Sequence, residues 1–306
     1  MLKKIRWYME IAFFLAVSFT VALLPASIAL AAGRWIGRGA FALLKGRRQV
    51  AIDNITASLP FLERQPGWQG GSVRELARET FENLGCSLVE VCKLYQGKGR
   101  EMIVSVEFRG LEHFQAAVSK GKGVAFITAH CGNWELLALA FGVRCHELSV
   151  VARRQDNPYL NRMTERIRKS YGNGIIYKDG ALRSMLAALK KREIIGVLVD
   201  QAVHPDGGVL LDFLGRPAWT LRLPSLIGRK SGAPLLPAFI HREDGRHIVT
   251  IHPEHDCSTG EDQNLSDLAD ARVLTRYIEE YIVEHPTQWY WVHKRWKNAP
   301  AAGEKL

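Results

Sequence analysis

Beyond residue 100, apolar and polar residues alternate between two kinds of segment. Short apolar runs that are typical of buried strands occur at 105–109, 124–129, 148–152, 174–177, 194–199, 235–240 and 247–251. Helical spacing of apolar residues occupies about 111–119, 134–143, 158–171, 180–191, 220–231 and 264–284. Because strands that alternate with helices form parallel sheets, this pattern predicts an α/β fold with a largely parallel central sheet flanked by helices.

The amino-terminal part of the chain follows a different pattern. Ile11–Ala32 contains no charged residue over 22 positions, and as a helix it would span about 33 Å, enough for the roughly 30 Å hydrocarbon core of a bilayer. Pro25 would kink such a helix without forbidding it. A cleaved signal peptide and a buried core helix are the alternatives, but the basic residues that follow directly disfavour export. We therefore predict a retained N-terminal transmembrane helix.

Basic residues are concentrated at this same end of the chain. The first fifty residues contain eight Lys and Arg against the single acid Glu10, which accounts for +7 of the net charge of +10. A basic excess beside apolar sequence favours anionic phospholipid as a partner and disfavours nucleic acid, which requires basic residues spread over a folded face. Five basic residues follow the apolar segment and three precede it, so the positive-inside tendency favours a cytoplasmic folded domain.

Composition shifts divide the chain into three parts. Residues 34–48 alternate basic and apolar side chains, which indicates an amphipathic stretch on the membrane surface or a helix packed on the domain. A loop at 65–71 precedes a helical pattern that continues to about residue 95. We expect a membrane anchor at 1–33, a membrane-proximal helical segment at 34–100, and an α/β domain at 101–306.

Cysteine and histidine positions do not follow a metal-ligand pattern. The five cysteines (Cys86, Cys92, Cys131, Cys145 and Cys257) are scattered and form no CxxC pair, which favours a reducing compartment and small buried thiols. His247 and His252 lie five positions apart, on opposite faces of a predicted strand, so they do not easily share a metal. We expect these two histidines and His255 to be packed or solvated, and we predict no metal site.

Candidate chemistry lies where the strand at 124–129 leads into the helix at 134. His130 and Glu135 are five positions apart and can meet only if His130 lies in the turn and Glu135 in the first helical turn. Gly132 gives the turn its backbone freedom, and Asn133 is a good N-cap. Glu135 would then keep one imidazole nitrogen protonated and leave the other free to accept a proton. A packed histidine beside a carboxylate that complements the helix dipole is the alternative.

Two more polar clusters follow predicted strands. Arg153 comes after the strand at 148–152, and Asp200 with Gln201 comes after the strand at 194–199. Because ligands bind at the carboxyl edge of open α/β sheets, we expect His130, Arg153 and Asp200 to gather there. Cys131 is not expected to be presented to His130, and no Ser or Cys occupies a nucleophile elbow. We therefore favour direct attack by a substrate hydroxyl over a covalent intermediate.

The segment His130-Cys131-Gly132-Asn133-Trp134-Glu135 resembles the H-x4-D/E motif of the lipid A biosynthesis acyltransferase family, the late acyltransferases of the bacterial inner membrane, which are related to the glycerolipid acyltransferases. The resemblance extends over nearly the whole chain. It includes Arg47-Arg48 ahead of 51–55, Ala152-Arg153 ahead of Asn157-Pro158, Val199-Asp200-Gln201, the segment FLGRPAWT at 213–220, and the segment PTQWYWVHKRWK at 286–297.

This resemblance implies transfer of a fatty acyl chain from acyl carrier protein to a hydroxyl of a lipid A precursor of the Kdo-lipid IVA type. It also implies a single-pass protein of the bacterial inner membrane with its catalytic domain facing the cytoplasm, and a reaction without metal or cofactor. His130 would be the general base, and Glu135 would be its orienting carboxylate.

The same resemblance implies a set of substrate-binding residues. Arg153 would bind a phosphate, since an arginine fork bonds phosphate bidentately, and Arg216 is a second phosphate candidate. Asp200 would complete the polar site, and Asn133 is included in the set. The glycine-containing loop at 202–219 is a candidate part of the acyl pocket.

Several alternatives stay open at this point. The acceptor could be another membrane glycolipid or aminolipid, or the chain could be a non-catalytic lipid-binding protein of the membrane surface. The aromatic and basic residues near the carboxyl terminus could bind headgroups or the acidic carrier protein, or could pack against the domain.

Overall fold

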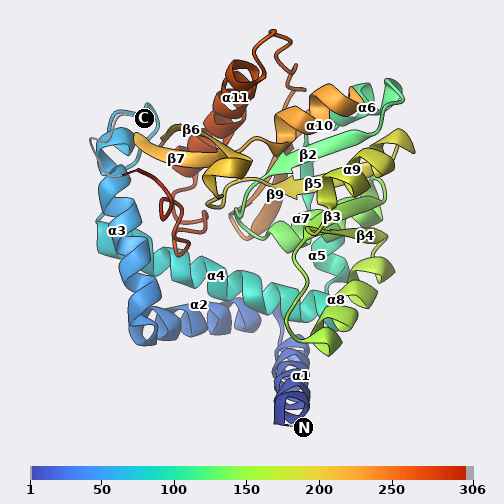
Figure 1. The fold of residues 1–306 in the computed structure, drawn as a ribbon. Coiled ribbons are helices and arrows are strands. Elements are labelled where there is room, and N and C mark those ends of the chain that lie inside the picture. Colours follow the sequence, from blue (N-terminus) through green and yellow to red (C-terminus); the bar gives the residue numbers. More distant parts are fainter. Residues whose placement is uncertain (1, 301–306) are drawn as a thin grey trace.

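The computed structural model describes residues 2–300, and the part before residue 106 is mainly helical (Figure 1). Five helices precede the first strand: α1 (Leu2–Leu23), α2 (Ala26–Leu43), α3 (Lys45–Leu62), α4 (Val73–Tyr95) and α5 (Arg100–Ser105). Ser72 is the N-cap of helix α4: its hydroxyl accepts the N–H of Glu75 and donates to the Glu75 carboxylate. The predicted loop at 65–71 therefore separates α3 from α4.

The bounds predicted for the membrane helix are wrong. Helix α1 ends at Leu23 and α2 begins at Ala26, so Ile11–Ala32 is not one kinked helix. Pro25 occupies the N-cap of α2, where its missing N–H interrupts the hydrogen-bond ladder. The one helix of the described chain that is long and apolar enough to cross a membrane covers Lys3–Leu23. The second half of the predicted span belongs to α2.

Helix α2 packs on α4 at very short range because small residues form the contact. Gly33 and Gly37 lie one turn apart on the buried face of α2. A Cβ atom at Gly37 would overlap the backbone of Phe81, and one at Gly85 of α4 would overlap the carbonyl oxygen of Gly33. This small-xxx-small arrangement is typical of helices whose backbones approach closely. The segment at 34–48 thus packs against the domain through one face of α2.

Seven strands form the central sheet. They are β1 (Glu107–Arg109), β2 (Val124–Thr128), β3 (Leu148–Ala152), β4 (Asn173–Tyr177), β5 (Ile194–Leu198), β8 (Leu235–Glu243) and β9 (Arg246–Ile251), in the order β1-β9-β8-β2-β5-β3-β4. All neighbouring strands are parallel except β8 and β9, which form a hairpin. The predicted fold class, a largely parallel sheet flanked by helices, is confirmed.

Helices cover both faces of this sheet and enclose two apolar cores (Figure 1). The remaining helices are α6 (Leu111–Ser119), α7 (Trp134–Arg144), α8 (Pro158–Ser170), α9 (Ala181–Lys190), α10 (Leu223–Ser231) and α11 (Gln263–Glu284), with a short 3-10 turn, η1, at Pro205–Gly207. Phe114 and Phe141 pack with Phe126 of β2 in one core. Met185 and Ile282 belong to the other.

A two-stranded hairpin lies outside the central sheet, where the sequence predicts a loop. Strands β6 (Gly208–Phe213) and β7 (Arg216–Leu221) are antiparallel. Their turn places Leu214 at φ 52° and Gly215 at φ 73°, the positive pair required by a tight two-residue hairpin turn. Val209, Leu211 and Phe213 alternate towards the core along β6. This alternation with a period of two is typical of a strand. The glycines of the segment favour the prediction of a loop instead.

The close contact between α2 and α4 is testable with two glycines of the same helix. We expect Gly37→Ala to destabilise the protein by about 1–3 kcal/mol, because the added methyl group meets backbone that cannot move aside. Gly39→Ala is the matched control, since a Cβ there meets nothing within 4 Å, and it should be neutral or stabilising by about 0.5–1 kcal/mol. Thermal unfolding in detergent measures both. Equal stability of the two variants would contradict the packing argument.

Candidate active site

The carboxyl ends of four parallel strands bring polar residues to one edge of the sheet. Arg153 directly follows β3 and Lys178 directly follows β4, while His130 and Asp200 each lie two residues beyond β2 and β5. His130, Arg153, Lys178 and Gln201 line one cavity of about 470 Å³. The prediction that His130, Arg153 and Asp200 gather at this edge agrees with their positions.

The turn that carries His130 is shaped by the two residues named for it in the sequence. Gly132 has φ 50°, and a Cβ there would collide with the carbonyl oxygen of Ile240. Asn133 caps α7, since its Oδ1 accepts the N–H of Leu136 at 3.0 Å. Helix α7 begins at Trp134. His130 therefore lies in the turn and Glu135 in the first helical turn, as the spacing required.

The prediction that Glu135 contacts the imidazole is nevertheless wrong, because the carboxylate that holds His130 is Asp200. Asp200 Oδ1 lies 2.7 Å from His130 Nδ1, and Oδ2 accepts the backbone N–H of His130 at 3.0 Å. The indole N–H of Trp289 donates to the same Oδ2 at 2.9 Å. The contact follows from the register of the sheet: Thr128 pairs with Leu198 across β2 and β5, so the residues two positions beyond each also meet.

These donors determine the charge of Asp200 and the tautomer of His130. Burial by itself raises the pKa of Asp200, but the charge and hydrogen bonds of His130 and the bond from Trp289 bring that pKa below its ordinary value. An ionised Asp200 favours a proton on His130 Nδ1 and leaves Nε2 as the proton acceptor. Nε2 lies 3.2 Å from the side-chain nitrogen of Gln201 on the cavity wall. The Asp200 side chain is 2% exposed and that of His130 is 17% exposed, so only the imidazole reaches the cavity.

Glu135 has a different partner. Its two oxygens accept bidentate hydrogen bonds from Arg168 of α8 at 2.9 and 2.8 Å, and Oε1 also accepts from the hydroxyl of Tyr95 at 3.0 Å. Burial alone lowers the pKa of Arg168, but the hydrogen bonds and charge of Glu135 raise it above its ordinary value, so Arg168 stays charged. Because Arg168 also lines the cavity of His130, Glu135 holds a guanidinium in the wall of that cavity.

A second buried carboxylate, Glu90 of α4, supports the turn at 130–133 through Asn133. It accepts hydrogen bonds from Asn133 at 2.8 Å, Arg242 at 2.7 Å and His247 at 2.9 Å. Burial raises the pKa of Glu90, but His247 and Arg242 together lower it to about 2. The Asn133 side chain thus donates to Glu90 and accepts from the N–H of Leu136, so both of its polar atoms bind other parts of the protein. These contacts do not support the predicted role of Asn133 in substrate binding. His247 is packed, in line with the expectation for it.

The two predicted phosphate-binding arginines differ in position. Arg153 lines the cavity, its side chain is 70% exposed, and its partner is Asp156 at 3.0 Å. A surface pair of this kind is weak, so Arg153 is available to an anionic ligand. Arg216 instead lies on β7 with its guanidinium 4.2 Å from the ring centre of Trp296, outside the lining of this cavity. The structure therefore brings Arg153 to His130 and does not bring Arg216 there.

The segment that follows α11 closes the site. The N–H of Gly132 donates to the carbonyl of Gln288 at 2.8 Å, and the N–H of Tyr290 donates to the carbonyl of His130 at 3.1 Å. Trp289 and Trp291 are each 1% exposed. The aromatic residues near the carboxyl terminus are thus packed against the domain, the second of the two interpretations drawn from the sequence. Trp289 is a site residue that the sequence analysis missed.

An apolar groove of about 310 Å³ adjoins this cavity. Leu84, Leu88, Val91 and Tyr95 of α4 form one wall, and residues 133–135 with Tyr290 form the other. Trp134 lines both the groove and the cavity, and its ring centre lies 5.1 Å from that of His130. Of the loop expected to form the acyl pocket, only Ala202 and Val203 line the cavity.

Cys131 lies beside His130 in the chain but is 1% exposed. Burial raises the pKa of the Cys131 thiol well above its ordinary value, and the charge of Asp200 adds to this effect. A protonated, buried thiol is a poor nucleophile, because the thiolate is the reactive form. This agrees with the expectation that Cys131 is not presented for reaction.

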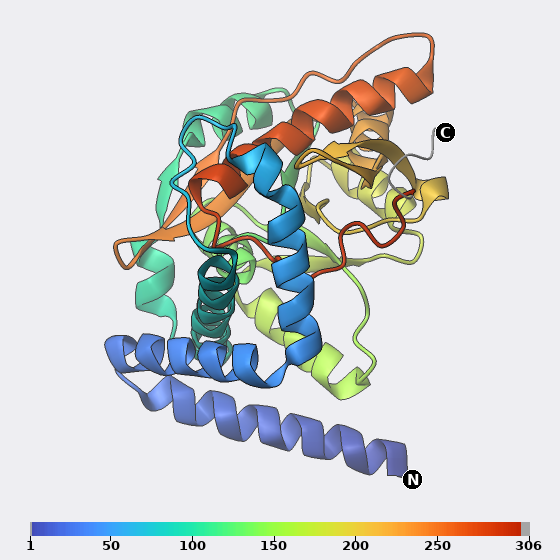
Figure 2. The same ribbon diagram turned by 90° about the vertical axis from the view of Figure 1, so that its left-hand side faces the viewer.

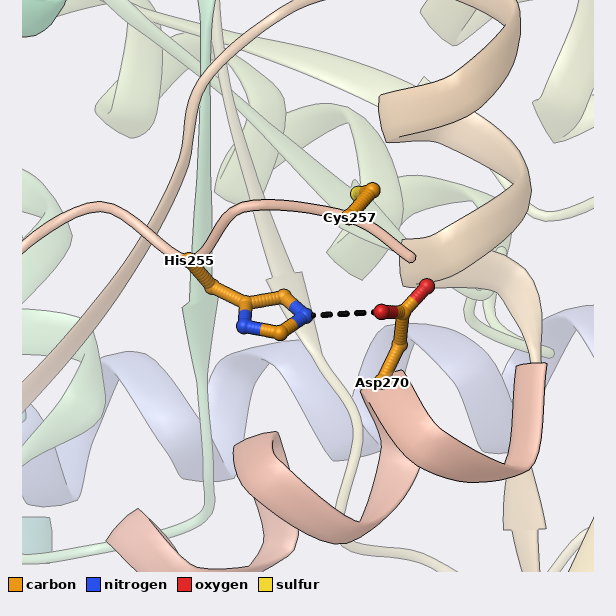
Figure 3. A group of neighbouring side chains, drawn as sticks. All are labelled: His255, Cys257 and Asp270. Carbon is orange, nitrogen blue, oxygen red and sulfur yellow. Dashed lines mark hydrogen bonds and ion pairs between the residues drawn. The ribbon is translucent and has the colours of Figure 1, made fainter. Parts of the chain in front are cut away.

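His255, Cys257 and Asp270 form a separate group whose candidate ligand atoms lie within 4.8 Å of one another (Figure 3). The group lies at the opposite edge of the sheet, since His255 bridges to Leu235 at the start of β8. Asp270 Oδ1 accepts from His255 Nε2 at 3.0 Å and from the N–H of Ser258 at 2.8 Å, and Arg229 pairs with Oδ2 at 3.3 Å. The carboxylate is satisfied and faces a cation, so the group is a hydrogen-bonded structural cluster.

Comparison with known proteins identifies the family to which this chain is similar. The model of the bacterial lipid A biosynthesis acyltransferases matches residues 2–298. The chain is 25% identical to the lipid A biosynthesis lauroyltransferase of Escherichia coli K12, over 94% of this chain and 90% of that protein. It is also 25% identical to the lipid A biosynthesis palmitoleoyltransferase of the same organism, over 92% and 89%.

Two other acyltransferases are similar over a smaller part of the chain. A phosphatidylinositol mannoside acyltransferase of Mycobacterium tuberculosis is 25% identical over 61% of this chain and 58% of that protein. Among solved structures, the 1-acyl-sn-glycerophosphate acyltransferase PlsC of Thermotoga maritima is 18% identical, covers 76% of this chain and 95% of its own, and has a TM-score of 0.38. With a family model that matches almost its full length, this chain belongs to the bacterial lipid A biosynthesis acyltransferases.

Proposed function

We propose that this enzyme transfers a fatty acyl chain from acyl carrier protein to a hydroxyl of a lipid A precursor of the Kdo-lipid IVA type, at the cytoplasmic face of the bacterial inner membrane. Family membership supports acyl transfer onto lipid A. The observation that carries the mechanism is the pair of His130 and the buried, ionised Asp200, which leaves imidazole Nε2 at the wall of a cavity. This is the arrangement of a general base.

In the proposed step, the oxygen of the acceptor hydroxyl attacks the carbonyl carbon of the thioester, and His130 Nε2 accepts the proton of that hydroxyl. The new C–O bond forms, the C–S bond breaks, and the imidazolium returns the proton to the departing thiolate. Asp200 stabilises the imidazolium while it exists. The N-terminus of α7, which begins four residues beyond His130, carries the positive end of a helix dipole suited to the developing oxyanion.

Each substrate has a matching surface around His130. The cavity is lined by three basic residues, Arg153, Arg168 and Lys178, and guanidinium and ammonium groups suit the phosphates of a lipid A precursor or of a carrier-protein prosthetic group. The neighbouring groove is apolar and suits an acyl chain. Trp134 lies between them, so a thioester carbonyl at this ring would be next to the base. Glu135 positions Arg168 in this scheme and does not contact His130.

Two finer points stay predictions. The similarity to a phosphatidylinositol mannoside acyltransferase favours another membrane glycolipid as the alternative acceptor. The division into an anchor at 1–33, a membrane-proximal segment at 34–100 and an acyltransferase domain at 101–306 also stays a prediction. A non-catalytic lipid-binding role is disfavoured by the paired His130 and Asp200.

Removal of the base should abolish the reaction. We expect His130→Ala to lower kcat by roughly 10²–10⁴-fold, the range for loss of a general base, while the protein stays folded and membrane-bound. Labelled acyl-acyl carrier protein with Kdo-lipid IVA as acceptor gives the readout, and other glycolipids tested in parallel identify the acceptor. His146→Ala, at an exposed position two residues beyond the end of α7, is the matched control. Undiminished transfer by folded His130→Ala would refute the assignment of the base.

The identity of the orienting carboxylate can be tested by neutral substitutions. Asp200→Asn should lower kcat by roughly 10²–10⁴-fold with little change in KM, because an amide does not stabilise the imidazolium. Trp289→Phe removes one donor to Asp200 and should lower kcat about tenfold, the equivalent of one hydrogen bond. Glu135→Gln should mainly raise KM, because it loosens Arg168. If Glu135→Gln instead reproduces the kcat loss and Asp200→Asn does not, Glu135 is the orienting group after all.

Acyl-chain selection should respond to the width of the apolar groove. Leu88→Trp adds bulk to the groove wall, so the ratio of kcat/KM for a longer over a shorter acyl donor should fall by about tenfold or more, as steric exclusion of methylenes requires. Competition between 12- and 14-carbon acyl carrier protein donors measures this ratio. Val104→Trp, an exposed position on α5 outside the groove lining, is the control. An unchanged ratio in Leu88→Trp would place the acyl chain elsewhere.

A further inference from the structure

Helix α1 is fastened to the folded body near its N-terminus. The side-chain nitrogen of Asn157, at the start of α8, donates to the carbonyl of Trp7 and to Glu10, each at 3.0 Å. Tyr8 packs on Tyr159 with ring centres 4.7 Å apart, and their hydroxyls lie 2.9 Å apart. These contacts join the first third of α1 to α8.

The opposite end of α1 is fastened to α4. The amide of Gln96 donates to the Ser18 hydroxyl at 2.6 Å. The ammonium group of the buried Lys93 donates to the carbonyls of Ala22 at 3.4 Å and Leu24 at 2.5 Å. Lys93 thereby satisfies carbonyls that the end of a helix leaves without a partner, and it places a cation where the helix dipole favours one.

The distance between these two attachments decides how α1 meets a membrane. Trp7 and Leu24 are separated by about 26 Å along a helix, close to the roughly 30 Å thickness of the hydrocarbon core. If α1 crossed a bilayer with both attachments in place, Asn157 and Lys93 would lie near opposite faces of it. Helices α4 and α8, with charged residues such as Arg162 and Arg166, would then be drawn through hydrocarbon at great cost. A helix attached in this way lies along the membrane.

The outer surface of α1 and α2 suits that position. Figure 2 shows α1 as the lowest element of the molecule, with α2 just above it, and the two helices are joined at Leu24-Pro25. Their exposed side chains are largely apolar: Ile5, Met9, Phe13, Leu15, Val17, Phe19, Leu23, Ile28, Trp35 and Ile36. Basic residues lie away from the apolar turn, with Lys3, Lys4 and Arg6 near one end and Arg34 and Arg38 in the second half of α2. Apolar surface with basic margins is typical of helices at a bilayer interface.

We propose that α1 and α2 lie in the plane of a single phospholipid leaflet, with their exposed apolar surface among the acyl chains, and that α1 does not cross the bilayer. The N-terminus is then on the same side as the catalytic cavity. Phe14 of α1 packs edge-on against Tyr95, which lines the apolar groove, so the inserted layer adjoins the groove and its lipid substrate. This inference rests on the attachments of α1 and is independent of the proposed reaction.

Topology can be read from two protease sites on one full-length chain. A cleavable tag before Met1 and a second after Leu306 are added, and the protein is reconstituted into sealed phosphatidylethanolamine and phosphatidylglycerol vesicles. If α1 lies in one leaflet, external protease cuts each molecule at both sites or at neither. If α1 spans the bilayer, each molecule is cut at one site only, which would overturn the proposal. Detergent-solubilised protein, cut at both sites, is the control for access.

Insertion of the outer face can be measured separately. Phe13→Glu with Phe19→Glu should weaken binding to the same vesicles by about tenfold or more, because two apolar side chains that leave water on binding become charged. Both positions are exposed, so folding should be preserved. Val104→Glu with Val118→Glu, exposed apolar positions on α5 and α6, is the matched control and should bind as the unmodified protein does. Unchanged binding by the α1 variant would show that this face is not inserted.

A covalent tether provides a third measurement. Tyr8→Cys with Tyr159→Cys, joined by a short bis-maleimide, holds α1 against α8. We expect tethered protein to bind vesicles and to transfer acyl groups as well as untethered protein does. Each single variant is a control, because Cys145 and Cys257 are only partly buried. Loss of vesicle binding on tethering would mean that α1 must leave the body to enter the membrane.

Discussion

The architecture around the candidate active site depends on the buried carboxylate of Asp200. A carboxylate removed from water is stable only when hydrogen-bond donors replace the solvent. Asp200 obtains these donors from the turn after β2 and from an indole near the carboxyl terminus. The requirement therefore joins three segments that are distant in sequence. Each of them must be in place before His130 has a defined orientation and tautomer.

Glu90 repeats this principle one layer away. It is also buried, and its donors come from the cap of α7 and from the β8–β9 hairpin. The two carboxylates hold the two ends of the turn at 130–133. Asp200 contacts His130, and Glu90 contacts Asn133. The turn of the candidate site is therefore held at both of its ends by buried, hydrogen-bonded carboxylates. Rigid support of this kind is what precise placement of a base requires.

The sequence predicted the strands of the central sheet, most helices and the gathering of His130, Arg153 and Asp200 at one sheet edge, because periodicity and strand direction are local properties. It missed the β6–β7 hairpin. It did not identify the partner of His130. The short spacing to Glu135 drew attention to a neighbour in the chain, whereas the real partner comes from the adjacent strand, and strand order cannot be derived from periodicity. Trp289 was missed for the same reason. The break at Pro25 was underestimated because apolar composition continues through it, although the fold places its two halves in different helices.

The closure of the site by residues 288–290 has a consequence for biosynthesis. The ribosome produces α1 and α2 first and Trp289 near the end, and domains fold largely in the order in which they emerge. In a nascent chain α1 and α2 are therefore present while Asp200 still lacks its indole donor and the turn at His130 lacks its carboxyl-terminal support. The pair of His130 and Asp200 therefore gains its full set of contacts only once the chain is nearly complete.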